Sequence, residues 1–328
     1  MRQLSFSDIE LGQSRKPSRV SQKLEKINEI VDWAAVLTIV QAVDKTSKVT
    51  GGAPHRNLLT KVKMVFLQHL YNLSDPELED QVNDRLSFQY FAGIDYSTTV
   101  PDFSTIWRFK EALIKEGLMD KLFNLIVGFI EEKGLLLKKG TCVDASIIQS
   151  TTKPLSKQGR EELEKNPSSQ IDTDADSTSK RGKKYFGYKG HIGIDINTKL
   201  IRKRGFTSAR PHDSTQKDNL LSGDEQAIFG DSAYSNKADK QKARKEGVYY
   251  GMLDKATRSK KLSTSQKKRN KKKSKVRNQV EHPFAYMKEK LNYKKAVAKN
   301  QLRNALRFDF NCILYNIFRA NYLLQRAS

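Results

Sequence analysis

Two kinds of residue patterning meet near Gly140, and this change constrains the fold more than any other feature of the sequence. From Leu58 to Gly134, apolar residues recur at helical spacing in four segments that brief polar stretches separate. After Gly140, short apolar runs alternate with polar stretches in the order strand, hairpin, helix, strand, helix, strand and helix. The sequence therefore predicts a helical region followed by an α/β domain with a mixed sheet.

Composition divides the chain into three expected parts: an N-terminal arm over residues 1–54, a helical domain over residues 55–133 and an α/β domain over residues 134–328. Two stretches of the last part are too polar to pack and are expected to be loops. They are an insertion at about 151–183 and a basic loop at about 255–276. The short helices of the second part permit a helix-turn-helix, and a plain helical bundle fits the same spacing.

The charge of the chain indicates an anionic partner. It carries 60 Lys and Arg residues against 37 Asp and Glu residues, a formal net charge of +23. Such an excess releases counterions from a phosphate backbone and so favours nucleic-acid binding. The first residues lack a signal pattern and no apolar run is long enough to span a bilayer, so we expect a cytoplasmic protein without a membrane partner. Cys142 and Cys312 form neither a disulfide framework nor a metal-ligand spacing.

Three acidic residues stand where an expected element begins or ends. Asp144 lies at or near the end of the first strand, Asp231 ends the apolar run of "AIFGDSAY", and Glu281 lies at a helix start in "RNQVEHPFAYMK". Strand ends face the crevice where α/β proteins place their sites, although Asp231 could equally cap the following helix. Carboxylate oxygens suit Mg²⁺ or Mn²⁺, and a pair of these ions can activate a water or a 3′-hydroxyl at a phosphodiester.

The motifs "GYKGH", "HDS", "GDSAY" and "RNQVEHPFAYMK", in this order, resemble those of DDE transposases of bacterial insertion sequences, in the group named after insertion sequence five. The resemblance extends from about Leu58 to the C-terminal helix. It implies a ribonuclease-H-like catalytic domain over residues 134–328, preceded by a helical DNA-binding domain over residues 55–133. It also implies that Asp144, Asp231 and Glu281 are catalytic and bind two Mg²⁺ or Mn²⁺ ions per active site.

The same resemblance assigns two cations near the third acid. Arg277, Glu281 and Lys288 match the last three residues of the Tyr-Arg-Glu-Lys signature of that family, whereas Ser274 stands where the Tyr is expected. On one helix the three matching residues would fall within about 40° of one another, so that two cations for DNA phosphate flank one acid. If the helix starts at Pro283, Arg277 falls outside this face.

Other basic residues are candidates for DNA contact. The run "KKRNKKKSK" would usually be a solvated loop, but it leads directly into the helix of the third acid. We therefore favour contact of its residues Lys271, Lys272 and Lys273 with the DNA backbone. In the helical domain, Trp107 and Arg108 are candidates for base recognition.

Several acidic residues offer alternatives that we weigh against these assignments. Asp195 competes with Asp231 as the second ligand, but it ends a hairpin strand at a turn, where Asp is common. The run "DTDAD" imitates the start of a calcium loop, but Ser177 and Lys183 occupy the positions where that loop needs Gly and Glu. Asp213 is expected to cap a helix over "HDSTQKDNLLSG", and a lone His212 is usually structural.

The sequence thus predicts a DNA transposase that binds the terminal inverted repeats of its element, cleaves DNA and transfers the 3′-OH strand in a metal-dependent reaction. The resemblance implies a bacterial, nucleoid-associated protein and a homodimer or higher assembly. Two alternatives stay open. A non-catalytic, domesticated DNA-binding protein would lack metal-dependent cleavage, and a nuclease would cleave without yielding strand-transfer products.

Overall fold

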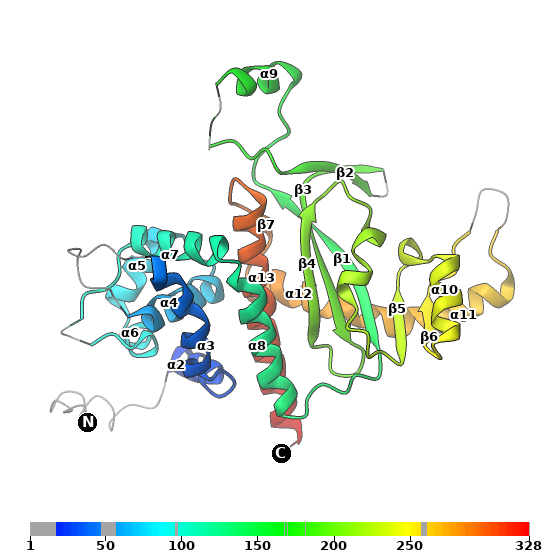
Figure 1. Cartoon of the computed structure of the whole chain (residues 1–328), viewed down its shortest axis with the longest axis horizontal. Coiled ribbons are helices and arrows are strands. Elements are labelled where there is room, and N and C mark those ends of the chain that lie inside the picture. Colours follow the sequence, from blue (N-terminus) through cyan, green and yellow to red (C-terminus); the bar gives the residue numbers. More distant parts are fainter. Residues whose placement is uncertain are drawn as a thin grey trace.

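The computed structural model describes residues 18–46, 57–95, 98–166, 168, 170–180, 182–256 and 261–327 (Figure 1). A helical N-terminal region lies on one side of the long C-terminal helix α13 (Gln301–Ala327), and a mixed sheet lies on the other. This arrangement confirms the predicted helical region and the predicted α/β region with a mixed sheet. Within the described ranges, no helix has the length and apolar character needed to cross a bilayer.

The helical region is held together by apolar side chains that recur at helical spacing. Its α5 helix begins with a capping box, in which Ser74 accepts from the N–H of Glu77 while the Glu77 carboxylate accepts from the N–H of Ser74. The helices are α2 (Arg19–Asn28), α3 (Trp33–Val40), α4 (Leu58–Tyr71), α5 (Asp75–Asp84), α6 (Leu86–Ala92), α7 (Phe103–Lys115) and α8 (Leu118–Glu132), with a 3₁₀ turn at Gln41–Thr46.

The expected N-terminal arm differs from the structure in its described part. Helices α2 and α3 pack into the common core, where Leu24 and Ile27 are buried, and the side-chain amide of Asn321 on α13 donates to the carbonyl of Lys26 at 2.6 Å. The first 17 residues and residues 47–56 lie outside the described ranges. Apolar residues spaced along α2 therefore place residues 19–40 with the helical region.

The sheet has an antiparallel half and a parallel half. Strand β1 (Thr141–Ser150) pairs antiparallel with β3 (Lys183–Asp195), which pairs antiparallel with β4 (Ile201–Ser208). On the other side, β1 pairs parallel with β5 (Ala227–Gly230), and β5 pairs parallel with β6 (Tyr249–Met252). The predicted hairpin is confirmed as β3 and β4. Two short strands complete the sheet: β2 (Asp176–Lys180) beside β3, and β7 (Lys295–Ala296) beside β1.

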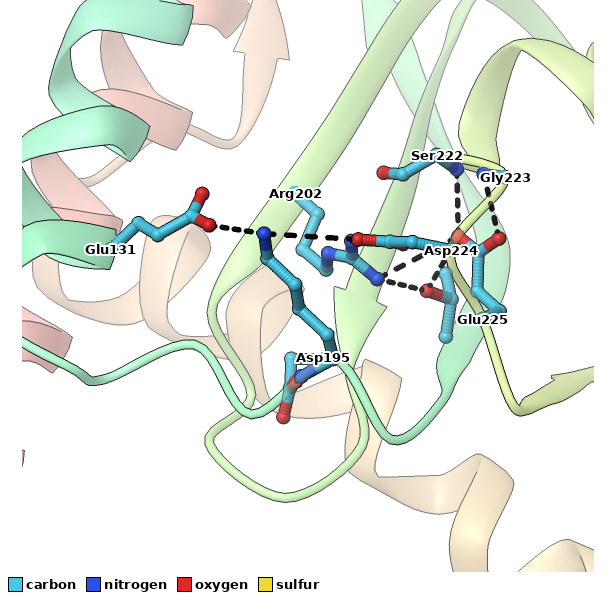
Figure 2. Close-up of polar contacts among 9 residues, drawn as sticks. Glu131, Asp195, Arg202, Ser222, Gly223, Asp224 and Glu225 are labelled. Carbon is cyan, nitrogen blue, oxygen red and sulfur yellow. Dashed lines mark hydrogen bonds and ion pairs between the residues drawn. The ribbon is translucent and has the colours of Figure 1, made fainter.

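The end of the sheet near Thr141 is closed by an ionic network (Figure 2). Arg202 on β4 donates to both carboxylate oxygens of Asp224 at 2.5 and 2.7 Å and to the hydroxyl of Thr141 at 3.0 Å. Glu225 accepts from the backbone N–H groups of Ser222 and Gly223 at 2.6 and 2.8 Å. The network fixes the turn that leads into β5.

Both stretches expected to be loops contain regular structure. The polar insertion holds helix α9 (Lys157–Lys165), which projects from the body of the molecule in Figure 1, and strand β2. The basic stretch is mostly helix α11 (Thr264–Arg277). Ser263 and Gln266 form a capping box at its start, and Asn270 exchanges two hydrogen bonds with the backbone of Asp254. Polar contacts hold this helix against the rest of the protein, so the lack of an apolar pattern led to the wrong prediction of a loop.

The remaining turns and helices connect the strands of the sheet and join the sheet to the helical region. The segment "HDSTQKDNLLSG" forms two 3₁₀ turns, Asp213–Gln216 and Asp218–Leu220, where the sequence predicted a capped helix. Helix α10 (Lys237–Lys245) joins β5 to β6, and α12 (Glu281–Lys290) follows α11 after a 3₁₀ turn at Asn278–Val280. Helix α13 contacts α4 and α8 on one side and β4 on the other, so it joins the helical region to the sheet.

Candidate active site

Asp144 and Asp231 lie side by side because their strands are parallel neighbours in register. Val143 of β1 pairs with Gly230 of β5, and the two acids are the next residues on the two strands. Adjacent strands lie about 4.8 Å apart, so the two carboxylates lie close together, and the charge of Asp231 acts on Asp144. Asp144 lies inside β1, which continues to Ser150 because β3 goes on pairing with it; only the contact with β5 ends at Val143.

Asp231 caps a turn through one carboxylate oxygen, which leaves its other oxygen available. Its Oδ1 accepts from the N–H of Ser232 at 2.5 Å, at the start of the 3₁₀ turn Ser232–Tyr234. Its Oδ2 forms no hydrogen bond or ion pair with the residues that the structure describes. The capping and ligand interpretations of Asp231 are therefore compatible, since one oxygen remains for another partner.

Arg277 connects Asp144 to Glu281. Its Nη1 lies 3.0 Å from Oδ2 of Asp144, and its Nη2 lies 3.2 Å from Oε1 of Glu281. Helix α11 ends at Arg277 and α12 begins at Glu281, with Pro283 in its first turn. The intervening residues keep right-handed helical backbone angles, so Arg277 and Glu281 remain neighbours at positions i and i+4. The acid on α12 is thus linked to the acid on β1 through one guanidinium group.

Burial shapes the electrostatics of Asp144. The side chain is 18% exposed, and burial raises the pKa of its carboxyl to about 6. The N–H of Ala145, Arg277 and Lys180 oppose this rise of the pKa, whereas the neighbouring charge of Asp231 adds to it. Burial therefore makes the ionised form of Asp144 less favourable than it is in water, and a bound cation would offset this cost.

Of two further residues near the acids, Tyr234 escaped the sequence analysis, and Asp213 was expected only to cap a helix. The cap of the 3₁₀ turn Asp213–Gln216 is His212 instead. Tyr234 is buried, and its hydroxyl has no hydrogen-bond partner among the described residues. Burial raises the pKa of Tyr234, and the charges of Asp144, Asp213 and Asp231 raise it further. Asp213 itself forms an ion pair with Lys189 at 2.8 Å. The motifs "HDS" and "GDSAY" contain both residues, but only the fold shows that they lie close together.

The donor set suits a hard divalent cation, and Arg277 competes for it. Across the part of the chain that the structure describes, no three metal-binding side chains already converge. Asp144 and Asp231 are neighbours, whereas Glu281 is held at the far side of the guanidinium group. Carboxylate oxygens are the ligands that Mg²⁺ and Mn²⁺ prefer. An ion shared by all three acids would have to displace Arg277.

The predicted DNA-binding cations fall into two groups. Lys271, Lys272 and Arg108 are exposed, and Lys288 donates from Nζ to the hydroxyl of Ser146 at 3.1 Å. Lys273, in contrast, is turned inward.

The inward position of Lys273 corrects its assignment to DNA contact. Its side chain is only 10% exposed, donates to the carbonyl of Met252 at 2.7 Å and pairs with Asp254 at 3.8 Å. Lys273 therefore docks α11 on the end of β6 and does not present a charge at the surface.

Asp195 is excluded as an alternative ligand of this site by its partners. It is fully buried and accepts from the backbone N–H groups of Lys138, Asn197 and Thr198 at 2.8 to 3.0 Å. These bonds organise the turn between β3 and β4. In the "DTDAD" run, Asp172 accepts from the hydroxyl of Tyr188 at 2.6 Å, a structural contact that agrees with the rejection of a calcium loop.

Comparison with known proteins matches two family models. Residues 136–317, more than half of the chain, match a family described as "Transposase DDE domain", and residues 13–112 match one described as "Transposase domain (DUF772)". Two solved structures are similar. A piggyBac transposase synaptic complex with hairpin DNA has 11% identity and a TM-score of 0.45, with 96% of this chain and 76% of that chain covered. The Mos1 strand transfer complex has 11% identity and a TM-score of 0.20, with 86% and 99% covered. Both TM-scores lie below 0.5, so the family assignment depends on the sequence match.

Proposed function

Because this chain belongs to the family of DDE transposases, we propose that it binds the terminal inverted repeats of its own element, cleaves DNA there and transfers the 3′-OH strand. The observation that carries this proposal is the pair of carboxylates that follow the last matched residues of two parallel strands, with Glu281 tied to Asp144 through Arg277. We further propose that the chain belongs to the insertion-sequence-five group. The antiparallel and parallel halves of the sheet support a ribonuclease-H-like catalytic domain.

Asp144, Asp231 and Glu281 would hold the divalent ions, which we propose to be two Mg²⁺ or Mn²⁺. When bound, such ions lower the pKa of a water or hydroxyl and stabilise the leaving oxygen of the phosphodiester. The residues of the chain supply the other parts. The phosphodiester would lie beside Asp144 and Asp231, and Arg277 and Lys288 would bind its phosphate oxygens. If Arg277 turns from Asp144 or Glu281 to the phosphate, DNA binding frees acceptor oxygens of these acids.

DNA is the proposed partner of other exposed cations. Lys271 and Lys272 would contact the backbone from α11, and Arg108 is a candidate contact on the helical region. The net charge of +23 supports binding through phosphate contacts. Because two element ends must be brought together, we propose a homodimer or higher assembly.

The proposed activity is tested with labelled DNA that carries the sequences flanking this reading frame. Wild-type protein with Mg²⁺ should nick these ends and join them to a second DNA. Asp231→Asn should remove both products while leaving DNA binding intact, since an amide is a poor ligand for a hard cation. Asp218→Asn, which neutralises an exposed acid without an ion pair among the described residues, is the matched control.

The outcomes separate the candidate functions. Unchanged turnover in Asp231→Asn contradicts the assignment of the site. Nicked ends without joined products would indicate a nuclease. DNA binding without any metal-dependent product would indicate a non-catalytic DNA-binding protein.

A further inference from the structure

A two-stranded hairpin extends past the end of the main sheet next to the acid site. Strand β3 pairs with β1 from Gly187 onward and with β2 up to Gly187, so it changes partner at this residue. Gly187 has φ +146°, and a Cβ there would lie 2.4 Å from the carbonyl oxygen of Ile148. Only glycine fits this corner. In Figure 1 the hairpin runs across the end of the sheet, toward the side of β5 and β6.

The tip of this hairpin carries positive charge that the protein does not neutralise. Lys180 and Lys183 are paired directly across the two strands, and Lys184 follows. All three are exposed, and none of them forms an ion pair with the residues that the structure describes. Residues paired directly across two antiparallel strands point to the same face, and like charges in such a pair destabilise the hairpin. An arrangement of this kind is stabilised when an anion binds between the two lysines.

The hairpin tip lies within electrostatic range of the candidate active site from two directions. The charge of Lys180 lowers the pKa of Asp144 on β1, and it also contributes to the lowered pKa of Lys288 on α12, after burial of that side chain. Lys288 is anchored to Ser146, which lies on the same face of β1 as Asp144. Cations from three separate elements therefore lie near this face of β1: Arg277 from α11 contacts Asp144, Lys288 from α12 contacts Ser146, and the charge of Lys180 from the hairpin acts on Asp144.

We propose that the β2–β3 tip is a phosphate clamp, in which Lys180 and Lys183 bind backbone phosphates of the DNA strand that lies at Asp144 and Asp231. This inference rests on the proposed function, because it takes DNA as the ligand of the acid site. The clamp adds contacts from the hairpin to those from α11 and α12. It recognises the charge of the backbone and contributes affinity irrespective of base sequence.

The clamp is tested by the salt dependence of DNA binding. The affinity of the full-length protein for a random-sequence 30-base-pair duplex is measured without divalent metal over a range of salt concentrations. The slope of log affinity against log salt is negative, and each lost phosphate contact makes it shallower by about 0.9. This corresponds to about fivefold weaker affinity at 0.15 M salt. We expect this change for Lys180→Gln, and about twice the change in slope for the double variant Lys180→Gln/Lys183→Gln.

The matched control is Lys157→Gln, which removes an exposed cation from helix α9 of the same insertion. Slope and affinity of this variant should equal those of the wild type, and thermal unfolding should show that all variants are folded. Equal slopes for Lys180→Gln and Lys157→Gln would overturn the clamp. A wild type that fails to bind the duplex would overturn the clamp together with the proposed function. A shallower salt dependence in Lys180→Gln, together with no Mg²⁺-dependent cleavage of the element ends by wild type, would support the clamp and contradict the proposed catalysis.

Discussion

Two places along β1 carry the same ionic motif and differ in how firmly they hold it. Near Thr141, Arg202 lies between Asp224 and Glu225 (Figure 2). Further along the strand, Arg277 lies between Asp144 and Glu281. Each site is one guanidinium group shared by two carboxylates. The surroundings decide whether the link is permanent.

The site at Arg202 is closed. The side chains of Arg202 and Glu225 are 5% and 4% exposed, and backbone N–H groups of Ser222 and Gly223 hold the Glu225 carboxylate. Arg202 also binds both oxygens of Asp224. Removing Arg202 would leave the Glu225 carboxylate buried without its cation.

The site at Arg277 is open. The Glu281 side chain is 63% exposed, and among the described residues its carboxylate forms an ion pair only with Arg277. Arg277 gives one nitrogen to each acid, so it can leave either carboxylate and bind a phosphate. Burial and the number of fixed partners, more than the presence of an ion pair, distinguish a structural link from a replaceable one.

The largest expected effect on stability is at the closed site. Arg202→Ala should lower the free energy of unfolding by about 3–5 kcal/mol, because it leaves Glu225 buried without its cation. Urea denaturation measures this loss, and cleavage per folded molecule should be unchanged. Arg210→Ala is the control and should change stability by less than about 0.5 kcal/mol, because the Arg210 side chain, which pairs with Asp176, is 80% exposed. Equal losses in the two variants would contradict the distinction between closed and open sites.

A second prediction uses the opposite pKa shifts at the two sites. Burial raises the pKa of Asp144 to about 6, so the folded state holds this proton more tightly than the unfolded chain does. The resulting stabilisation is complete below about pH 4 and is lost as the pH rises to about 6. Asp144→Asn should not show this loss. Its free energy of unfolding should therefore rise relative to that of wild type as the pH increases from 4 to 7, by up to about 3 kcal/mol. Urea denaturation across this pH range measures the difference.

Asp224→Asn is the comparison for that experiment because the pKa of Asp224 is shifted in the opposite direction to that of Asp144. Burial acts to raise the pKa of Asp224, but the hydrogen bonds and charge of Arg202 outweigh it and lower the pKa. Asp224 therefore stabilises the fold above the pKa of the unfolded chain, and this contribution is lost as the pH falls. The same pH trend in both variants would show that the two carboxylates do not differ in the way we describe.

Much of the fold follows from local patterns. Alternation over "YKGHIGIDI" predicted the hairpin β3–β4, and helical spacing after Leu58 predicted the helical region, because buried faces impose these periods. The apolar run that ends at Asp231 predicted an acid at a strand end. Asp144 was also expected at or near a strand end, but β1 continues past it to Ser150 because β3 goes on pairing with it, and the register with β5 is what brings the two acids together.

Other features depend on contacts that leave no periodic trace. Helix α11 docks through Asn270 and Lys273, two polar side chains in a charged run, so its pattern was that of a loop. The exclusion of Asp195 required the backbone N–H groups of its turn. The approach of Lys180 to the acid site depends on the corner at Gly187 and on strand pairing far along the chain.

The smallest expected effect tests whether the link at Arg277 is replaceable. Arg277→Gln should raise the affinity of the DNA-free protein for Mn²⁺, because it removes a positive charge that lies between Asp144 and Glu281. A unit charge about 6 Å from a divalent ion costs about 1.4 kcal/mol in water, which corresponds to about tenfold in affinity. Titration calorimetry measures this change, with Lys275→Gln, an exposed cation of the same helix, as the control. The stability of Arg277→Gln should stay within about 1 kcal/mol of wild type, in contrast to Arg202→Ala. Weaker Mn²⁺ binding in Arg277→Gln would mean that Arg277 holds the acids in place for the ion, and the open site would then be as structural as the closed one.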